Sequence, residues 1–387
     1  MAVTIPLKDL CTMDITDGTH KTPTYVEEGY IFLSSKNVTS GVIDWENVMY
    51  IPESLHNELY KRIAPQKNDI LLAKNGTTGV AAIVDRDEVF DIYVSLALIR
   101  PDTTKVLPKY LLHAVNSHTT KQFFDSHLKG IGVPNLHLTY IREAPIKVPS
   151  ITEQQHITDV LDKISEIIIL RKEQLAKLDQ LVNSRFVELF GHKGYPEDSL
   201  LNLCNVIDYR GKTPEKVENG LPFITAKNVR MHQMNLEPRE YISKETYDKV
   251  MVRGFPKEGD VVFTTEAPLG NVCRIPHFDT EFYIGQRIVT LQTEKLEPVY
   301  LEYALSSDDF KTKYMGKSSG STVTGIRVRL LEQLTIPVPP MELQEQFAPF
   351  VEQTQKSKLA IQQSLDKLEL LKKSLMQEYF GQFKNCP

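Results

Sequence analysis

The sequence has little of what marks a disulfide-bonded, metal-bound or membrane-spanning protein. Its four cysteines, Cys11, Cys204, Cys273 and Cys386, stand far apart without a Cys-x-x-Cys pair, which argues against a disulfide framework and a zinc site. No stretch approaches the roughly 18 consecutive apolar residues of a membrane helix, and the opening MAVTIPLKDL lacks the pattern of a signal peptide. We expect reduced cysteines, no bound metal and a chain that stays in the cytoplasm.

An excess of positive charge is also missing. The net charge of −5 gives no overall attraction to nucleic acid, so a DNA-binding surface would have to be local or shared with a partner. Catalytic patterns are equally scarce. The segment Val338-Pro339-Pro340-Met341 lacks the polar first residue and aromatic last residue of an adenine methyltransferase loop. Before Gly316-Lys317-Ser318, the glycine that a phosphate-binding loop needs is replaced by Lys311. We expect no catalysis by this chain alone.

What the sequence does contain is a long internal repeat. The run Lys36-Asn37-Val38 returns 191 residues later as Lys227-Asn228-Val229, and Asp69-Ile70-Leu71 returns as Asp260-Val261-Val262. Towards the end the shift is 190, because Phe190-Gly191 returns as Phe380-Gly381. Solenoid repeats have periods of about 20–50 residues, so this period indicates a duplicated domain instead. A chain of 387 residues is also long enough for more than one core.

The first part of each copy has the pattern of an α+β domain. Short apolar runs such as ILLA at 70–73 are broken by Gly, Pro, Asn and Asp, which predicts short strands joined by turns. We also predict one moderate helix near Tyr110–Phe124 and its equivalent near Tyr300–Tyr314. The predicted globular domains are residues 1–150 and 192–340.

The second part of each copy predicts one long helix. Residues 152–190 contain no Pro or Gly, and apolar residues recur there in alternating steps of four and three, interrupted only by Arg171, while Lys358 interrupts the second seam. The first seam comprises Ile157, Leu161, Ile164, Ile168, Leu175, Leu178 and Val182. The second comprises Phe347, Val351, Thr354, Ile361, Leu365, Leu368 and Leu375.

The predicted spacer helices are residues 151–191 and 341–381, followed by a tail at 382–387. Thr152 with Gln155 fits a capping box, Gly191 fits a helix stop, and Pro349 is expected to delay or kink the second helix. Each helix would be about 58 Å long, and the two would pack as an antiparallel coiled coil.

The order and duplication of these patterns resemble the DNA specificity subunit of type I restriction-modification systems. The resemblance covers essentially the whole chain. Its most specific marks are Asp69-Ile70-Leu71-Leu72 before Gly76 and Gly79, Ile146-Lys147-Val148-Pro149 before Glu153-Gln154-Gln155, and Ile336-Pro337-Val338-Pro339-Pro340 before Glu342-Leu343-Gln344-Glu345-Gln346.

This resemblance implies two pseudo-repeated target recognition domains separated by two long helices. Each domain would read one half of a split sequence in double-stranded DNA, and the helices would fix the spacer and dock two methyltransferase subunits. Restriction/translocase subunits complete such a complex, and S-adenosylmethionine, ATP and Mg²⁺ are expected on the partner subunits. The specificity subunit itself is not a catalyst.

The duplication indicates which residues could read bases. If the two domains read different half-sites, residues that are identical in both copies cannot carry the difference. The clearest differing loops are 74–78 and 265–269. The base-readout candidates are Lys74, Asn75, Thr77, Thr78, Asn135, Thr265 and Glu266. Asn and Lys can contact adenine and guanine edges, whereas Glu266 could accept a hydrogen bond from cytosine N4. The alternative is that these are surface turn residues without a DNA contact.

A second group of residues is predicted to hold phosphates. Residues 311–329 contain five cationic side chains and no acidic one. The phosphate candidates are Lys36, Lys129, Lys227, Lys317, Ser318, Ser319, Arg327 and Arg329. Asn37 and Asn228 are expected to brace a turn instead. A rival hypothesis is a non-catalytic coiled-coil scaffold that joins two protein- or glycan-binding domains.

Overall fold

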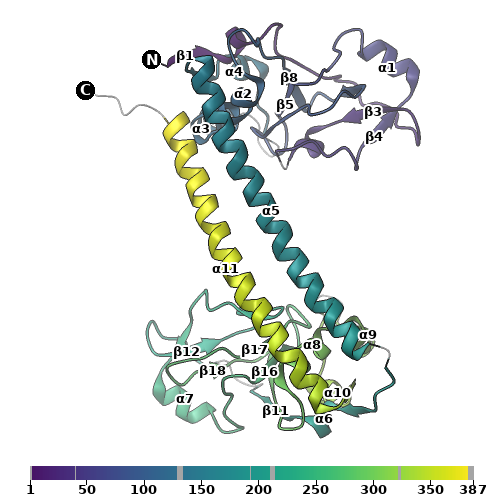
Figure 1. Cartoon of the computed structure of the whole chain (residues 1–387), viewed down its shortest axis with the longest axis vertical. Helices are drawn as coiled ribbons and strands as arrows, with labels where there is room; N and C mark the ends of the chain where they lie inside the picture. The colour runs from purple at the N-terminus through teal and green to yellow at the C-terminus, as the bar shows by residue number, and fades with distance from the viewer. Residues whose placement is uncertain are drawn as a thin grey trace. The chain divides into compact units, whose positions relative to one another are not determined.

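The computed structural model describes residues 2–39, 41–128, 134–191, 193–209, 214–320 and 324–381. The chain forms two compact units (Figure 1). Unit 1 comprises Met1–Lys172 and Gln363–Pro387, and unit 2 comprises Glu173–Gln362. Each unit therefore contains one globular region together with a segment of both long helices.

The globular region of unit 1 is built around a four-stranded sheet. Its strands, in spatial order, are β2 (Thr16–Asp17), β8 (Leu96–Ile99), β5 (Ile70–Ala73) and β6 (Ala81–Ile83). A three-stranded sheet holds β4 (Met49–Ile51), β3 (Tyr30–Leu33) and β7 (Phe90–Ile92), and β1 (Val3–Pro6) pairs with β9 (Pro145–Val148). Strand β5 is apolar throughout because both its faces are buried. Ile70 and Leu72 belong to one hydrophobic cluster, whereas Leu71 and Ala73 belong to another.

Unit 2 repeats this topology. Its four-stranded sheet holds β11 (Asn205–Asp208), β19 (Ile288–Gln292), β16 (Val261–Thr264) and β17 (Val272–Arg274) in the equivalent order. The three-stranded sheet holds β15 (Tyr241–Ile242), β12 (Leu221–Ile224) and β18 (Tyr283–Ile284), and β10 (Glu197–Ser199) pairs with β20 (Thr335–Pro337). A further hairpin joins β13 (Val229–Arg230) to β14 (Gln233–Met234). The matching strand orders confirm the duplicated α+β domain that the repeat predicts.

Short helices complete each globular region. In unit 1 these are α1 (Glu53–Leu59), α2 (Pro108–Val115), α3 (His118–Ser126) and α4 (Leu138–Arg142). In unit 2 they are α6 (Leu200–Leu203), α7 (Lys244–Val250), α8 (Pro298–Ser306), α9 (Asp308–Met315) and α10 (Val328–Leu331). The prediction of one helix after each Pro-x-Tyr-Leu is wrong, because a serine breaks it into two. The Ser117 hydroxyl accepts a hydrogen bond from the Thr120 amide at 3.3 Å, and Ser307 caps α9 in the same way.

The two long helices are α5 (Ile151–Phe190) and α11 (Met341–Phe380), and every residue of the two predicted seams is buried or half-buried. Within unit 2 their segments run antiparallel, because Asp179 forms an ion pair with Lys358 while Phe190 packs edge-on against Phe347. Within unit 1, Lys172 forms an ion pair with Glu369 at 2.9 Å. The sequence therefore predicted both the position and the packed face of each helix.

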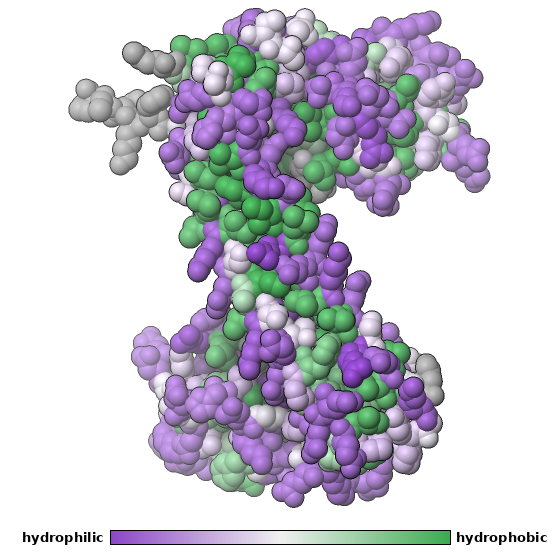
Figure 2. All heavy atoms as spheres, in the orientation of Figure 1, coloured by the Kyte–Doolittle hydropathy of each residue, from purple (hydrophilic) through white to green (hydrophobic). Residues whose placement is uncertain are grey.

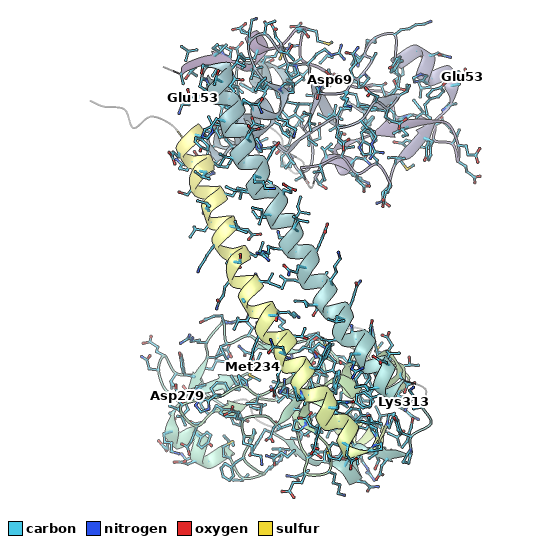
Figure 3. All side chains as sticks on the ribbon, viewed as in Figure 1. Glu53, Asp69, Glu153, Met234, Asp279 and Lys313 are labelled. Carbon is cyan, nitrogen blue, oxygen red and sulfur yellow. The ribbon has the colours of Figure 1, made fainter. Side chains whose placement is uncertain are left out.

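The start of α5 is fixed by two side chains. The prediction of Thr152 as the cap is wrong, because the helix begins at Ile151 and the Ser150 hydroxyl accepts from the Glu153 amide at 3.3 Å. Gln154, which follows the Glu153 labelled in Figure 3, is fully buried and connects the helix to the globular region by hydrogen bonds. Its amide oxygen accepts from the Leu107 amide at 2.8 Å, and its amide nitrogen donates to the carbonyls of Pro149 and Lys105 at 3.0 and 3.1 Å.

Helix α11 has an equivalent fastening. Gln344 accepts from the Glu297 amide at 3.0 Å and donates to the Pro339 carbonyl at 2.8 Å. Pro349 does not delay this helix, which already begins at Met341. Phe347 and Val351 on either side of the proline are fully buried in the core of unit 2. Their burial offsets the backbone hydrogen bond that proline removes.

A carboxylate on α5 provides another attachment in unit 1. Asp162 accepts hydrogen bonds from His113 at 2.8 Å and Lys109 at 2.7 Å, both on α2. These contacts, that of His113 first, lower the pKa of Asp162 to about 2. His113 thus has a carboxylate partner on the long helix.

The cysteines show no pairing in the described part of the chain. Cys11, Cys204 and Cys273 are free, and burial raises the pKa of each thiol to about 12. Cys386 lies outside the described residues. Over those same residues, no helix is both long and apolar enough to cross a membrane, and no three His, Cys, Asp or Glu side chains are grouped to hold a metal ion.

Candidate nucleic-acid interface

Candidate residues that are far apart in the sequence meet at one place in each unit. In unit 1 the loop after β5 lies against the segment that precedes α4, where the Leu136 amide donates to the Lys74 carbonyl at 2.8 Å. In unit 2 the loop after β16 lies against the segment that precedes α10, where the Ile326 amide donates to the Thr265 carbonyl at 2.9 Å. Each loop therefore forms a small surface together with the segment that contains Asn135 or Arg327.

A third segment, at the start of β8 or β19, completes this surface. The Lys74 amide donates to the Ser95 carbonyl at 2.9 Å, and the Thr265 amide donates to the Arg287 carbonyl at 2.8 Å. Sequence reasoning missed Ser95 and Arg287. The signal was present, since the two copies differ there, but the repeat shift becomes 192 between these residues and hides the correspondence.

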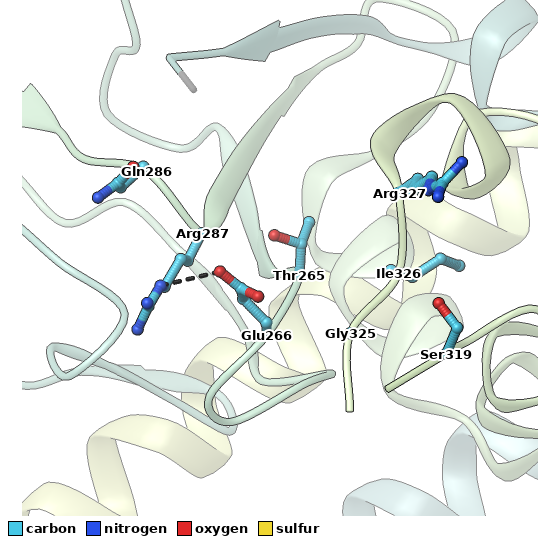
Figure 4. A pocket seen from close by; sticks show the side chains of 8 residues that line it. All are labelled: Thr265, Glu266, Gln286, Arg287, Ser319, Gly325, Ile326 and Arg327. Atoms are coloured by element: carbon cyan, nitrogen blue, oxygen red, sulfur yellow. Dashed lines mark ion pairs between the residues drawn. The ribbon is translucent and has the colours of Figure 1, made fainter. Parts of the chain in front are cut away.

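In unit 2 these three segments enclose a hollow of about 230 Å³ (Figure 4). It is lined by Thr265, Glu266, Gln286, Arg287, Ser319, Gly325, Ile326 and Arg327. The Arg287 Nε lies 2.9 Å from Glu266 Oε1 in an ion pair, and the two side chains are 52% and 41% exposed. Gly325 permits the close approach of the segment before α10, because a Cβ there would lie 3.1 Å from the Glu266 Cβ and 3.2 Å from the Thr265 carbonyl oxygen.

A second hollow of unit 2 continues this surface. It shares Gln286 and Arg287 with the first and adds Lys216, Lys227 and Glu240. Of the two carboxylates on the combined surface, Glu240 pairs with Lys216 at 2.8 Å and Glu266 pairs with Arg287. Lys227 and Arg327 are exposed and have no ion-pair partner among the described residues. The surface is therefore locally cationic although the chain is acidic.

The base-readout candidates differ widely in exposure. Thr77 is exposed, whereas Asn75, Thr78, Asn135 and Glu266 are half-buried. The remaining two are buried. The Lys74 ammonium forms an ion pair with Asp17 at 2.8 Å, and each side chain is only 8% exposed. The side chain of Thr265 is likewise covered, at 4% exposure of the residue. Lys74 and Thr265 thus belong to the interior of the loops and do not face outwards.

The phosphate candidates lie mostly on the surface. The exposed ones are Lys36, Lys227, Lys317, Ser319, Arg327 and Arg329. Ser318 is half-buried and its hydroxyl donates to the Met315 carbonyl at 2.8 Å. Lys129 lies outside the described residues.

Residues that are identical in both copies form hydrogen bonds that stabilise the fold, as predicted for the two asparagines. Asn37 Oδ1 accepts from the Ser34 amide at 2.9 Å, and Asn228 Oδ1 accepts from the Thr225 amide at 2.9 Å. Asp69 has a comparable role (Figure 3), since its carboxylate accepts two hydrogen bonds from Arg100 at 2.9 and 2.7 Å. These contacts fix the loops from which the differing side chains project.

Comparison with known proteins agrees with this architecture. Residues 3–180 and 196–372 each match the family model of the type I restriction modification DNA specificity domain. The type I restriction enzyme MjaVIII specificity subunit from Methanocaldococcus jannaschii is 24% identical over 317 residues, covering 74% of this chain and 72% of that protein.

Two solved structures resemble the fold. The crystal structure of the type I restriction-modification system S subunit from M. genitalium has a TM-score of 0.63 at 14% identity, covering 99% of this chain and 97% of the other. A chain from a structure on complex assembly and conformational transition of a type I R-M system has a TM-score of 0.55 at 19% identity, covering 98% and 97%. The two matches to the family model together cover most of the chain. The chain therefore belongs to the type I restriction modification DNA specificity family and carries two copies of its domain.

Proposed function

We propose that this chain is the non-catalytic, sequence-reading subunit of a type I restriction-modification complex. Each globular region reads one half of a bipartite double-stranded DNA target, and α5 and α11 set the spacer between the halves. The observation that carries this proposal is one scaffold built twice with different side chains at the same surface. Two rigidly connected readers measure half-site spacing as paired DNA-binding domains do. Such a role places the chain in the cytoplasm.

The surface chemistry supports a division between holding and reading. Lys36 and Lys227 occupy equivalent exposed positions in the two copies and suit sequence-independent phosphate contacts. Asn75 and Glu266 occupy equivalent loop positions but offer different hydrogen-bonding groups to a base edge. Lys74 is not proposed to read a base, because its ammonium already forms an ion pair with Asp17 in the interior.

The long helices suit the docking of protein partners. In unit 1, α5 exposes Ile169 and Leu170, whereas α11 exposes Leu370 and Leu371, with exposed fractions of 55%, 53%, 68% and 46%. Figure 2 shows hydrophobic residues at the surface over the two long helices. Exposed apolar clusters of this kind are typical of protein interfaces. We propose that two methyltransferase subunits dock on the helices and bring S-adenosylmethionine. Restriction/translocase subunits that use ATP and Mg²⁺ complete the complex.

A domain exchange tests the proposal. Residues 192–340 are replaced by the equivalent region of a relative with a different target, and methylated adenines are mapped on genomic DNA in cells with the cognate methyltransferase. One half of the recognised sequence should change while the other half and the spacer stay the same. An unchanged motif from an assembled, active complex would refute the proposal.

A binding measurement separates DNA reading from a scaffold role. The complex with methyltransferase should bind target DNA with a steep dependence on salt concentration, because phosphate contacts release counterions. A scaffold for protein or glycan ligands would show no such dependence and no preference for the target sequence.

A further inference from the structure

We infer that Arg287 is the residue with which unit 2 recognises a guanine in its half-site, and that Glu266 positions the Arg287 guanidinium for this contact. The inference rests on the proposed function and specifies the chemistry of one reading position. Neither the repeat nor the loop comparison in the sequence pointed to Arg287.

The comparison of the two units singles out this position. The backbone frame is shared, because the amides of Lys74 and Thr265 donate to the carbonyls of Ser95 and Arg287 at nearly the same distance. The side chains on that frame are unrelated. Ser95 is only 7% exposed and its hydroxyl accepts from the Ser35 amide at 3.0 Å, so it closes the loop in unit 1. The side chain of Arg287 instead extends from this shared backbone and is exposed.

The geometry of Arg287 suits a directed contact. Its backbone is left-handed, with φ of +74°, which is uncommon for a residue with a long side chain. Its side chain is 52% exposed and its Nε is held by Glu266. No other described residue forms an ion pair or a hydrogen bond with the guanidinium, whose far end extends away from Ser319 and Arg327 in Figure 4, so its Nη donors are available to a ligand.

Hydrogen-bonding chemistry then selects the ligand. A guanidinium fork held at Nε presents two parallel donors, and guanine N7 and O6 are the paired acceptors that match them in the major groove. Phosphate could also accept these bonds, but Glu266 cancels the charge that would attract it. The neighbouring Lys227 and Arg327 have no such counter-charge and are better placed to hold the DNA backbone.

Four variants, two of Arg287 and two of its partner Glu266, test the inference in the assembled methyltransferase complex. Arg287→Asn removes the fork while an asparagine tolerates the left-handed backbone. Arg287→Lys keeps the charge but cannot form the paired contact. Glu266→Ala releases the guanidinium, and Glu266→Gln keeps an acceptor for Nε. Methylation is measured on a library in which every position of the half-site is varied.

We expect one guanine in the half-site assigned to residues 192–340 to become degenerate in both Arg287 variants, with discrimination falling about 5- to 150-fold. Glu266→Ala should relax the same position and add nothing to Arg287→Asn, whereas Glu266→Gln should largely restore it. The matched control is Arg239→Lys. Arg239 forms the same kind of pair, Nε to Glu237 at 2.8 Å, but lines neither hollow, and its substitution should leave the motif intact.

Two results would overturn the inference. An unaltered motif in Arg287→Lys, with Arg287→Asn weakening all sequences equally and lowering the salt dependence, would make Arg287 a phosphate contact. An unaltered motif and unaltered affinity in every variant would remove Arg287 from the interface. Either result leaves the proposed function standing if the exchange of 192–340 still changes the half-site. If that exchange has no effect, the proposed function itself fails.

Discussion

Replacing Gln154 by leucine should loosen the joint between α5 and the globular region of unit 1. Leucine fills a similar volume but accepts and donates nothing, so the Leu107 amide and two carbonyls lose their partner. Leaving one covered amide unpaired costs about 1–3 kcal/mol, and each lost hydrogen bond to a carbonyl adds about 0.5–1.5 kcal/mol. Because Leu107 is half-buried and Lys105 is exposed, water can replace part of the lost bonds, and we expect a total of about 2–4 kcal/mol.

Hydrogen exchange is the suitable assay, because a chain with two units need not unfold in a single step. Amides in residues 103–110 should exchange about 30-fold faster or more in Gln154→Leu, since about 1.4 kcal/mol corresponds to a factor of ten. Gln155→Leu is the matched control. Gln155 is exposed, and among the described residues its side chain bonds only to Asp159, one turn away, so its loss should change exchange less than threefold.

Gln344→Leu extends the test to unit 2. It removes two hydrogen bonds, to the Glu297 amide and the Pro339 carbonyl, so faster exchange should appear around residue 297 and not in unit 1. The reasoning would be refuted if Gln154→Leu exchanged like the wild type, or if Gln155→Leu had an equal effect.

Three other substitutions have distinct expected outcomes. Asp162→Asn should lower unit 1 stability by about 1 kcal/mol at pH 7, because the side chain is 35% exposed and its interactions are screened. The carboxylate's contribution is present above its unfolded pKa of about 3.9 and is lost as pH falls through the folded value of about 2, so melting curves of the two proteins should converge there. Lys74→Thr should cost about 3 kcal/mol by leaving Asp17 buried without its partner, while the methylation motif stays the same; a changed motif in a stable variant would restore Lys74 as a reader. Gly270→Ala should destabilise more than Gly79→Ala in thermal melts. Both glycines have a positive φ, but a Cβ at 270 would lie 2.2 Å from a buried tyrosine hydroxyl, whereas at 79 the nearest atom is 3.5 Å away; equal melting temperatures would contradict this.

Much of the fold could be predicted because two strong signals agree. The long helices contain extended heptad patterns, interrupted only at Arg171 and Lys358, and the repeat indicates that an element formed in one copy also forms in the other. Local signals were less decisive. Ser117 and Thr152 are both plausible caps by residue type, but only Ser117 caps a helix, because the neighbouring Ser150 is the residue that caps α5. Pro349 was misjudged because the burial of its neighbours is not visible in the sequence.

The candidate site was predicted in part, for a different reason. Comparing the copies found the loops after β5 and β16, but it could not show which side chains face outwards. Lys74 was selected for its chemistry, yet a buried aspartate 57 residues earlier in the sequence neutralises it. Arg287 was missed because strand pairing, and not sequence spacing, brings it to the loop. Tertiary contacts decided both cases.

The main-chain hydrogen bonds around the hollow bear on how the DNA target of such a protein can change. The bonds that join its three segments run between main-chain amides and carbonyls, as at Thr265 with Arg287 and Ile326 with Thr265. Main-chain groups are the same whichever side chain is present. In the proposed function, a codon change at position 266 or 287 would therefore alter what the surface offers a base pair while these main-chain bonds stay the same. Evolution or engineering could then change recognition one residue at a time while the fold stays the same.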